Sequence, residues 1–218
     1  ERGAGQQQRG QQQRLVLAHA LLAGARVLVA DEPTTGQDSL NRREIAAELR
    51  RLADSGVTIV LLSHDLHLLR AVADETLLLD RGTVAGAGAP ARVLDERPAG
   101  PTRAAHPAGS TGSGGVPAGS GDVPSGSGRS TVGPDDAPAG PAVLRVAGLT
   151  AAYRGTVVLH GVDVAVAAGR CLAVVGRSGS GKTTLARCLA GLHRPATGTV
   201  RLDSRLLAAS LDRRTRAD

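Results

Sequence analysis

A glycine-rich stretch in the second half of the chain contains the residue types that bind phosphate. It fits the pattern G-x-x-x-x-G-K-[ST] and reads Gly176-Arg177-Ser178-Gly179-Ser180-Gly181-Lys182-Thr183-Thr184. Its glycines let the backbone curl so that successive N–H groups point at phosphate oxygens. In this pattern Lys182 reaches the β- and γ-phosphates, and the Thr183 hydroxyl holds Mg²⁺. The apolar run 171–175 predicts a buried strand before the stretch, and residues 183–190 predict a helix after it, so the required context is present.

Two further apolar runs deliver polar side chains at their carboxyl ends. Residues 26–30 lead into Asp31-Glu32-Pro33, as a buried parallel strand does when it ends in carboxylates. Proline cannot continue a hydrogen-bonded ladder, so this strand is expected to stop there. Residues 57–62 predict a second buried strand, which ends in Ser63-His64-Asp65.

The remaining pattern predicts an α/β fold with an additional antiparallel layer. Helices are expected over 15–23, from a reciprocal cap at Asn41 and Glu44 to Gly56, and over 66–72. Alternation of strands with helices favours a parallel sheet. Ahead of the glycine-rich stretch, short strands with turns between them predict an antiparallel layer, and residues 198–202 add one more strand. The expected short strands are 76–79, 83–84, 143–146, 149–153, 157–159 and 162–166.

Composition narrows the class of protein. The net charge is +6, but the arginines are scattered and Tyr153 is the single aromatic residue, which argues against nucleic-acid binding. Cys171 and Cys188 lack metal-type spacing and are interpreted as small buried hydrophobic residues in a reducing compartment, with a disulfide as the alternative. No apolar run is long enough to span a bilayer. The absence of Met leads us to expect a piece of a longer protein.

Several motifs together resemble the ATP-binding cassette (ABC) ATPases, the motor subunits of ABC transporters, over nearly everything outside residues 98–141. The run 28–35 resembles the family's Walker B element. This resemblance implies that Asp31 holds Mg²⁺ through water and that Glu32 polarises the attacking water. It also implies that His64 is the switch histidine at the γ-phosphate and that Tyr153 stacks on adenine. The structural alternatives are a solvated carboxylate pair, a structural histidine and a core or interface tyrosine.

The signature motif of the family departs from its usual form. A tandem pentapeptide occupies residues 5–14, and Gln7-Gln8-Arg9-Gly10-Gln11 stands where the family has Leu-Ser-Gly-Gly-Gln. Gly10 and Gln11 are the candidate signature residues, while the family's serine and first glycine are missing. Residues 3–6, one repeat earlier, look closer to the signature. Residues 35–38 resemble the D-loop, in which Asp38 matches the family's aspartate.

The order of the motifs predicts two cassettes in one polypeptide. A single cassette runs phosphate loop, signature, Walker B and histidine, whereas here the phosphate loop comes last. Residues 1–97 are interpreted as the C-terminal half of a first cassette, 98–141 as a disordered linker spanning on the order of 35 Å, and 142–218 as the N-terminal part of a second cassette.

The resemblance also implies an order of strands, as in other NTPases of this class. The strand that ends at His64 is expected between the strand before the phosphate loop and the Walker B strand. The expected fold is therefore a P-loop NTPase with a RecA-like parallel sheet, helices and an antiparallel β layer. Two alternatives stay open: a circularly permuted cassette in which Lys182, Thr183, Asp31, Glu32 and His64 converge, or two unassociated halves.

The resemblance implies binding and hydrolysis of ATP with Mg²⁺, energising import of a small solute of the peptide or metal/vitamin class. Residues 181–192 are similar to the peptide/nickel importer branch, and residues 35–38 also suit the energy-coupling ATPases. The implied partners are membrane-spanning permease subunits, an extracytoplasmic solute-binding protein and the second cassette of the same chain, with no nucleic acid. The implied location is the cytoplasmic face of the plasma membrane, as a peripheral protein. The alternatives are a non-transport ABC ATPase of DNA repair or translation, and an inactive truncated fragment.

Overall fold

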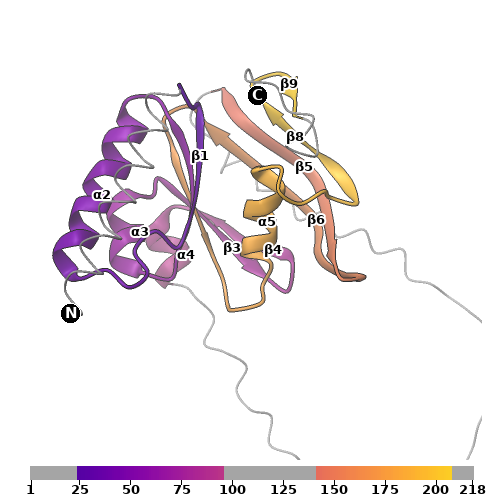
Figure 1. Cartoon of the computed structure of the whole chain (residues 1–218), viewed down its shortest axis with the longest axis horizontal. Helices are drawn as coiled ribbons and strands as arrows, with labels where there is room; N and C mark the ends of the chain where they lie inside the picture. Colours follow the sequence, from indigo (N-terminus) through magenta and orange to yellow (C-terminus); the bar gives the residue numbers. More distant parts are fainter. Residues whose placement is uncertain (1–23, 96–140, 208–218) are drawn as a thin grey trace, which may run out of the picture.

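Two segments far apart in the sequence fold together around one mixed sheet (Figure 1). The computed structural model describes residues 24–95 and 141–207. The first segment contains β1 (Val27–Asp31), α2 (Ser39–Asp54), β2 (Thr58–Leu62), α3 (Leu66–Val72), β3 (Glu75–Asp80), β4 (Thr83–Gly88) and α4 (Pro90–Asp95). The second contains β5 (Ala142–Tyr153), β6 (Thr156–Ala167), β7 (Cys171–Val175), α5 (Lys182–Leu189), β8 (Thr197–Leu202) and β9 (Arg205–Leu206).

The strand that precedes the phosphate loop lies inside the sheet of the other segment. The strand order is β1-β2-β7-β3-β4. Strands β1, β2, β7 and β3 are parallel, and β4 pairs antiparallel with β3. The predicted α/β P-loop architecture is therefore confirmed, with β2 between β1 and β7 as the resemblance implied. The two segments share one sheet, as in the permuted alternative, and are not unassociated halves.

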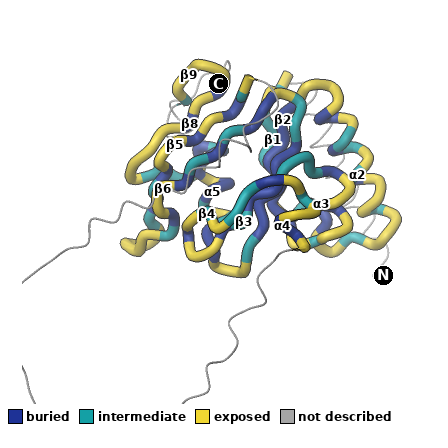
Figure 2. The backbone as a smooth tube through the Cα atoms, turned by 180° about the vertical axis from the view of Figure 1, so that it is seen from behind, coloured by how far each residue is buried: buried dark blue, intermediate teal, exposed yellow. Residues whose placement is uncertain are grey.

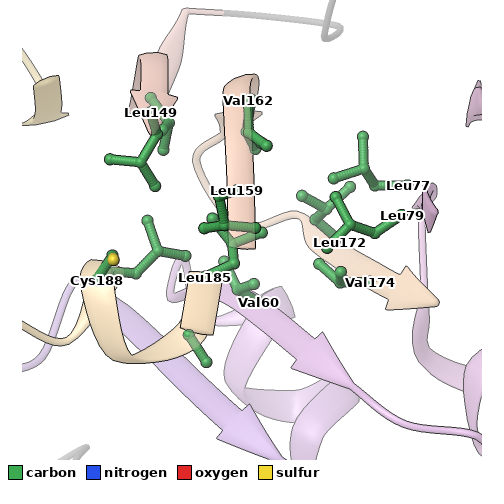
Figure 3. Close-up of a cluster of buried hydrophobic side chains, with 14 of the residues drawn as sticks. Val60, Leu77, Leu79, Leu149, Leu159, Val162, Leu172, Val174, Leu185 and Cys188 are labelled. Carbon is green, nitrogen blue, oxygen red and sulfur yellow. The ribbon is translucent and has the colours of Figure 1, made fainter. Parts of the chain in front are cut away.

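Both faces of this sheet are covered, which explains why its central strands are apolar at every position. Every residue of β2 and of β7 is buried (Figure 2). Val60, Leu62, Leu172 and Val174 face a core shared with α5 and the antiparallel strands (Figure 3). Alternate residues of the same strands, such as Ile59 and Leu61, face a second core under α2, α3 and α4. Neither β2 nor β7 could keep both faces out of water without helices on one side and the second sheet on the other.

The antiparallel layer is formed by longer strands than the sequence predicted. Its order is β6-β5-β8-β9, and β5 and β6 each run for 12 residues. The predicted breaks within these strands are bulges, at which the β5–β6 register shifts while pairing continues. At one of them Gly148 has a φ of 60° and its N–H donates to Asp163 Oδ1 at 2.7 Å. The expectation of four short strands here was wrong, because a bulge leaves the same turn-like sequence signal as a loop.

Helix α2 begins earlier than the predicted cap. Its N-cap is Asp38, whose side chain accepts a hydrogen bond from the Asn41 N–H at 2.8 Å. Asn41 is thus the third helical residue and not the cap, so that part of the prediction was wrong. Helix α3 has the predicted bounds. Within residues 24–95 and 141–207, no helix has the length and apolar character needed to cross a membrane.

Both cysteines are free and buried, as expected, and their ionisation predicts an alkaline loss of stability. Burial, with a further contribution from the charge of Asp74, raises the pKa of Cys171 from 9.0 to about 12, and burial raises that of Cys188 to about 11.

The unfolded chain ionises its thiols near pH 9, whereas the folded protein keeps them protonated. This contribution to stability is complete below pH 9 and is lost as the pH rises towards about 12. Urea midpoints should therefore fall from pH 8 to pH 10.5, and fall less in a Cys171→Ala/Cys188→Ala variant. Identical pH dependence of the two proteins would contradict the assignment.

Candidate nucleotide-binding site

Three neighbouring strands end at one edge of the sheet and carry the candidate residues there. In the parallel register Asp31 of β1 pairs with Leu62 of β2, and Leu62 pairs with Val174 of β7. Glu32 and His64 therefore follow strands that end level with the strand leading into Gly176. The carboxyl edge of parallel strands, at which the chain passes into loops and helix N-termini, is where open α/β sheets bind ligands. The topology thus brings the phosphate loop and the Glu32–His64 pair to one edge of one sheet.

The phosphate loop is shaped by glycines that have no room for a side chain. A Cβ on Gly176 would lie 2.1 Å from the Leu79 carbonyl oxygen, and one on Gly181 would lie 2.7 Å from Leu159 Cδ2. Both glycines have positive φ angles, of 153° and 104°. The loop is also tied to the β3–β4 turn, because the Gly82 N–H donates to the Ser180 carbonyl at 3.0 Å. Helix α5 begins immediately afterwards at Lys182, so its free N–H groups open onto the loop.

The loop presents a cation and an orphaned hydroxyl, which fit an anion. Lys182 Nζ donates to the carbonyl oxygens of Gly176 and Arg177 at 2.8 and 3.0 Å. These acceptors belong to its own loop and carry no charge, so the lysine can exchange them for phosphate oxygens. Ser180 Oγ is buried without a hydrogen-bond partner. A Cβ on Gly179 would meet nothing within 4 Å, so the loop is open at that point. Within the predicted phosphate-binding stretch 176–184, the exposed residues are Arg177, Ser178, Gly179 and Thr183, while Thr184 is half-buried.

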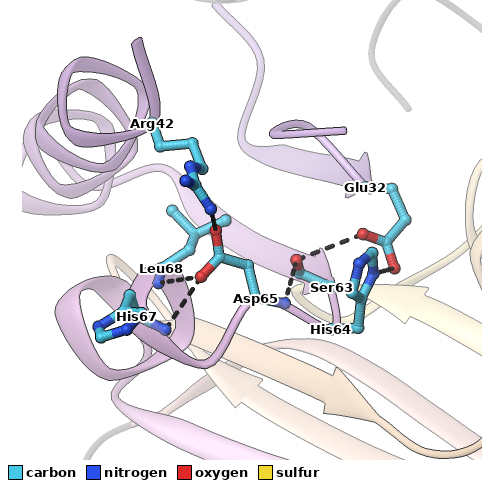
Figure 4. A network of polar contacts seen from close by, with 7 residues as sticks. All are labelled: Glu32, Arg42, Ser63, His64, Asp65, His67 and Leu68. Atoms are coloured by element: carbon cyan, nitrogen blue, oxygen red, sulfur yellow. Dashed lines mark hydrogen bonds and ion pairs between the residues drawn. The ribbon is translucent and has the colours of Figure 1, made fainter. Parts of the chain in front are cut away.

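Glu32 and His64 form a side-chain pair between the ends of β1 and β2 (Figure 4). His64 Nδ1 lies 2.9 Å from Glu32 Oε1, and the Ser63 hydroxyl donates to Glu32 Oε2 at 3.4 Å. Glu32 has a φ of 51°, in the left-handed region, while its N–H still donates to the Leu62 carbonyl at 2.8 Å. Strained backbone of this kind recurs at functional sites. The Glu32 side chain is 31% exposed and that of His64 is 79% exposed, so both can meet a solvent-borne ligand.

A capping aspartate fixes the segment that carries His64. Asp65 Oδ1 accepts from the N–H groups of His67 and Leu68 at 3.0 and 3.2 Å, which caps α3. Its other oxygen pairs with Arg42 of α2 at 3.4 Å. Sequence reasoning used Asp65 only as a neighbour of His64 and did not identify Ser63 as a partner of Glu32. The aspartate carried a local signal for its cap, because aspartate commonly bonds to nearby backbone N–H groups at helix starts, whereas the contact of Ser63 with Glu32 joins residues 31 positions apart.

A magnesium ion fits this edge only as part of a nucleotide complex. Among the described residues, no group of three or more His, Cys, Asp or Glu is placed to hold a metal ion. Mg²⁺ is commonly held by one or two carboxylates together with substrate phosphates. Asp31 is exposed at the end of β1, and Thr183 is exposed in the first turn of α5, so both can supply oxygen ligands to a phosphate-bound ion.

Tyr153 lies at the far end of β5, in the hairpin to β6. The residue is 46% exposed, and the guanidinium carbon of Arg154 lies 5.6 Å from the ring centroid. The second ring beside it is that of His193, which sequence reasoning did not identify. The signature candidates Gly10 and Gln11 lie outside the described residues. Asp38 is exposed and serves as the N-cap of α2, a role compatible with its expected place in the D-loop.

The close packing of the loop predicts unequal effects of two glycine substitutions. Gly176→Ala should lower the free energy of unfolding by about 3 kcal/mol, because the new methyl group overlaps a backbone carbonyl. Gly179→Ala has open space and a φ of 79°, so it should cost only the left-handed strain of about 1–2 kcal/mol. Urea unfolding of both variants measures the difference. Equal midpoints would show that the loop does not pack on β3 as described.

A parallel sheet in which the strand before the phosphate loop lies beside the strand that ends at His64, with an antiparallel layer over one face, has the architecture of a P-loop NTPase. Residues 159–217 match the family described as ABC transporter. The chain is 30% identical over 191 residues to a putative ABC transporter ATP-binding protein of Methanosarcina acetivorans. That match covers 88% of this chain and 33% of the relative.

Shorter matches point to the same family. A putative ABC transporter ATP-binding protein of Saccharolobus solfataricus is 38% identical over 85 residues, 39% of this chain and 16% of the relative. One from Staphylococcus aureus is 35% identical over 88 residues, 40% of this chain and 15% of the relative. The chain is therefore similar to the ABC transporter ATP-binding proteins, in agreement with its motifs. The matches span a third or less of the relatives' lengths.

Proposed function

We propose that this chain binds Mg·ATP at the carboxyl edge of its parallel sheet and hydrolyses it there. The observation that carries the proposal is the convergence of three strand ends, which bring the phosphate loop and the Glu32–His64 pair to one edge. In this assignment residues 176–184 bind the triphosphate and Tyr153 stacks on the base. Asp31 and Thr183 supply oxygen ligands to Mg²⁺, which neutralises the developing charge on the phosphates.

Glu32 is assigned as the residue that orients and polarises the attacking water. Its carboxylate is held by His64 and Ser63 at the strand ends, so its direction is fixed before a ligand arrives. His64 is assigned to the γ-phosphate side of the same group, where an imidazole can hold both the carboxylate and the water in line. Positioning and charge neutralisation, more than covalent chemistry, account for catalysis of phosphoryl transfer.

The same proposal extends to the domain organisation. Residues 1–97 are assigned to the end of one cassette and 142–218 to the start of the next, joined by residues 98–141. A match of 191 residues within a chain of 218 necessarily contains residues 28–191. The match with the Methanosarcina relative therefore spans parts of both segments, although it covers only 33% of that relative. Because successive cassettes share one architecture, the end of the first and the start of the second complement each other in one sheet.

At the level of the whole protein, we propose that hydrolysis energises import of a small solute of the peptide or metal/vitamin class. ABC ATP-binding proteins generally partner with membrane permeases, and here those partners would be permease subunits and an extracytoplasmic solute-binding protein. The assigned location is peripheral, at the cytoplasmic face of the plasma membrane. The candidate signature residues Gly10 and Gln11 and the D-loop Asp38 are assigned to contacts across the cassette pair.

Nucleotide binding by the full chain tests the proposal. Titration with Mg·ATP should show saturable binding that Lys182→Ala weakens about 10- to 100-fold, because a charge-assisted contact to phosphate is lost. The fold should persist, because Lys182 Nζ donates its hydrogen bonds to carbonyl oxygens of its own loop. Arg187→Ala, on the exposed side of α5, is the control for loss of one positive charge. Absence of ATP binding, or equal affinity in the Lys182 variant, would favour an inactive fragment.

A further inference from the structure

The surroundings of Tyr153 contain a second ring that no motif predicted. The centroids of the Tyr153 and His193 rings are 6.3 Å apart, with an angle of 44° between their planes. This distance lies within the range of interacting aromatic pairs. Arg154 approaches the tyrosine as well, and Tyr153 as a residue is 46% exposed. Tyr153 therefore has neighbours that restrict its orientation while part of its surface stays open.

His193 is held in place independently of Tyr153. Its Nε2 lies 2.9 Å from the Ala152 carbonyl oxygen. A carbonyl only accepts, so Nε2 carries the hydrogen of this bond. The His193 backbone N–H donates to the Arg187 carbonyl at 3.1 Å, in the last turn of α5. His193 thus connects the last turn of α5, through its backbone N–H, with the hairpin that carries Tyr153, through its imidazole.

A purely anchoring role does not require this side chain. The segment that follows α5 is already tied to β5, because the Ala196 N–H donates to the Thr150 carbonyl at 2.8 Å. Gly191, with a φ of 74°, ends the helix through its own bond to the Cys188 carbonyl at 3.1 Å. What the imidazole adds to these backbone contacts is its bond to the Ala152 carbonyl and a ring placed beside the tyrosine.

We infer that His193 is a positioning residue of the base-binding part of the site, which holds the Tyr153 ring as a platform for adenine. This inference rests on the proposed ATP binding and adds a residue to it. His193 holds the Tyr153 ring at a fixed position relative to α5. The distance between the phosphate loop and the ring that would stack on the base is therefore fixed as well. A nucleoside triphosphate contacts both the phosphate loop and the Tyr153 ring, whereas a ligand without a base contacts only the loop.

Comparison of ATP with inorganic tripolyphosphate separates the two parts of the site. In the full chain with Mg²⁺, His193→Ala should weaken ATP binding about 3- to 10-fold and leave tripolyphosphate binding unchanged. Arg194→Ala, the adjacent exposed residue, is the matched control and should change neither. Tyr153 is the single tyrosine in a chain without tryptophan, so its fluorescence reports this corner alone. The emission change on adding ATP should be smaller in the His193 variant.

Three other results of these binding experiments would overturn the inference, each for a different reason. Unchanged ATP affinity in His193→Ala would show that the ring does not position the platform. Equal weakening of ATP and tripolyphosphate binding would show that His193 only supports the fold around the loop. If the unsubstituted chain bound neither ligand, the proposed function itself would fail, and this inference with it.

Discussion

Glu32→Gln should reduce hydrolysis of Mg·ATP by this chain about 10²- to 10⁴-fold while leaving ATP binding nearly unchanged. The glutamine keeps the size of the side chain and an oxygen that can accept from Ser63, so the strand ends should stay in place. It removes the negative charge that orients and polarises water. Single-turnover phosphate release measures the effect, and equilibrium titration confirms that the nucleotide still binds.

A second carboxylate provides the control for this experiment. Glu48 lies on α2 and pairs with Arg51 at 3.1 Å, outside the network of Figure 4. Glu48→Gln should leave both binding and hydrolysis as they are. If Glu32→Gln hydrolysed ATP at the unsubstituted rate, the Glu32–His64 pair would have no role in the chemistry.

Asp74→Ala should lower the free energy of unfolding by an amount on the order of 3 kcal/mol, because Asp74 joins the two segments of the sheet. Its carboxylate accepts from the Cys171 N–H at 2.8 Å and pairs with Arg50 and Arg170 at 3.2 and 3.3 Å. Its own N–H donates to the Cys171 carbonyl at 2.8 Å. The side chain is only 15% exposed, so its removal leaves Arg170 and the buried Cys171 N–H without this acceptor, while Arg50 keeps Asp54 and the Val72 carbonyl.

Urea denaturation of the full chain measures this loss as a lower midpoint with an unchanged slope. Asp74→Asn keeps an oxygen for the Cys171 N–H and should lose less. Both variants and the unsubstituted chain should unfold in one transition, since β7 lies between β2 and β3. Separate transitions for the two segments, or an unaffected midpoint in Asp74→Ala, would mean that the segments do not share one sheet in solution.

Much of the site could be predicted because its residues are close in sequence to strong local signals. The phosphate loop, Asp31-Glu32 and His64 each directly follow an apolar run of strand length. The runs 57–62 and 171–175 are apolar at nearly every position, which indicated burial on both faces, and β2 and β7 are buried throughout. The neighbouring positions of these strands followed from the family resemblance and were confirmed by the sheet order.

The parts that sequence reasoning missed depend on contacts between residues far apart in the chain. His193 and Ala152 are 41 positions apart, and Asp74 and Cys171 are 97 apart. No local periodicity reports such pairs. Strands β5 and β6 were divided at positions that prove to be bulges, because a glycine that permits a bulge looks the same in sequence as one that permits a turn.

The phosphate loop of the second segment and the Glu32–His64 pair of the first should serve the same bound nucleotide. Replacing Mg²⁺ by paramagnetic Mn²⁺ in a complex with a non-hydrolysable ATP analogue tests it directly by proton NMR of the histidine rings. The His64 resonances should broaden on addition of Mn²⁺·analogue, stay sharp with Mg²⁺·analogue, and stay sharp in Lys182→Ala with either metal. Sharp His64 resonances while the unsubstituted chain holds the Mn²⁺ complex would contradict the claim.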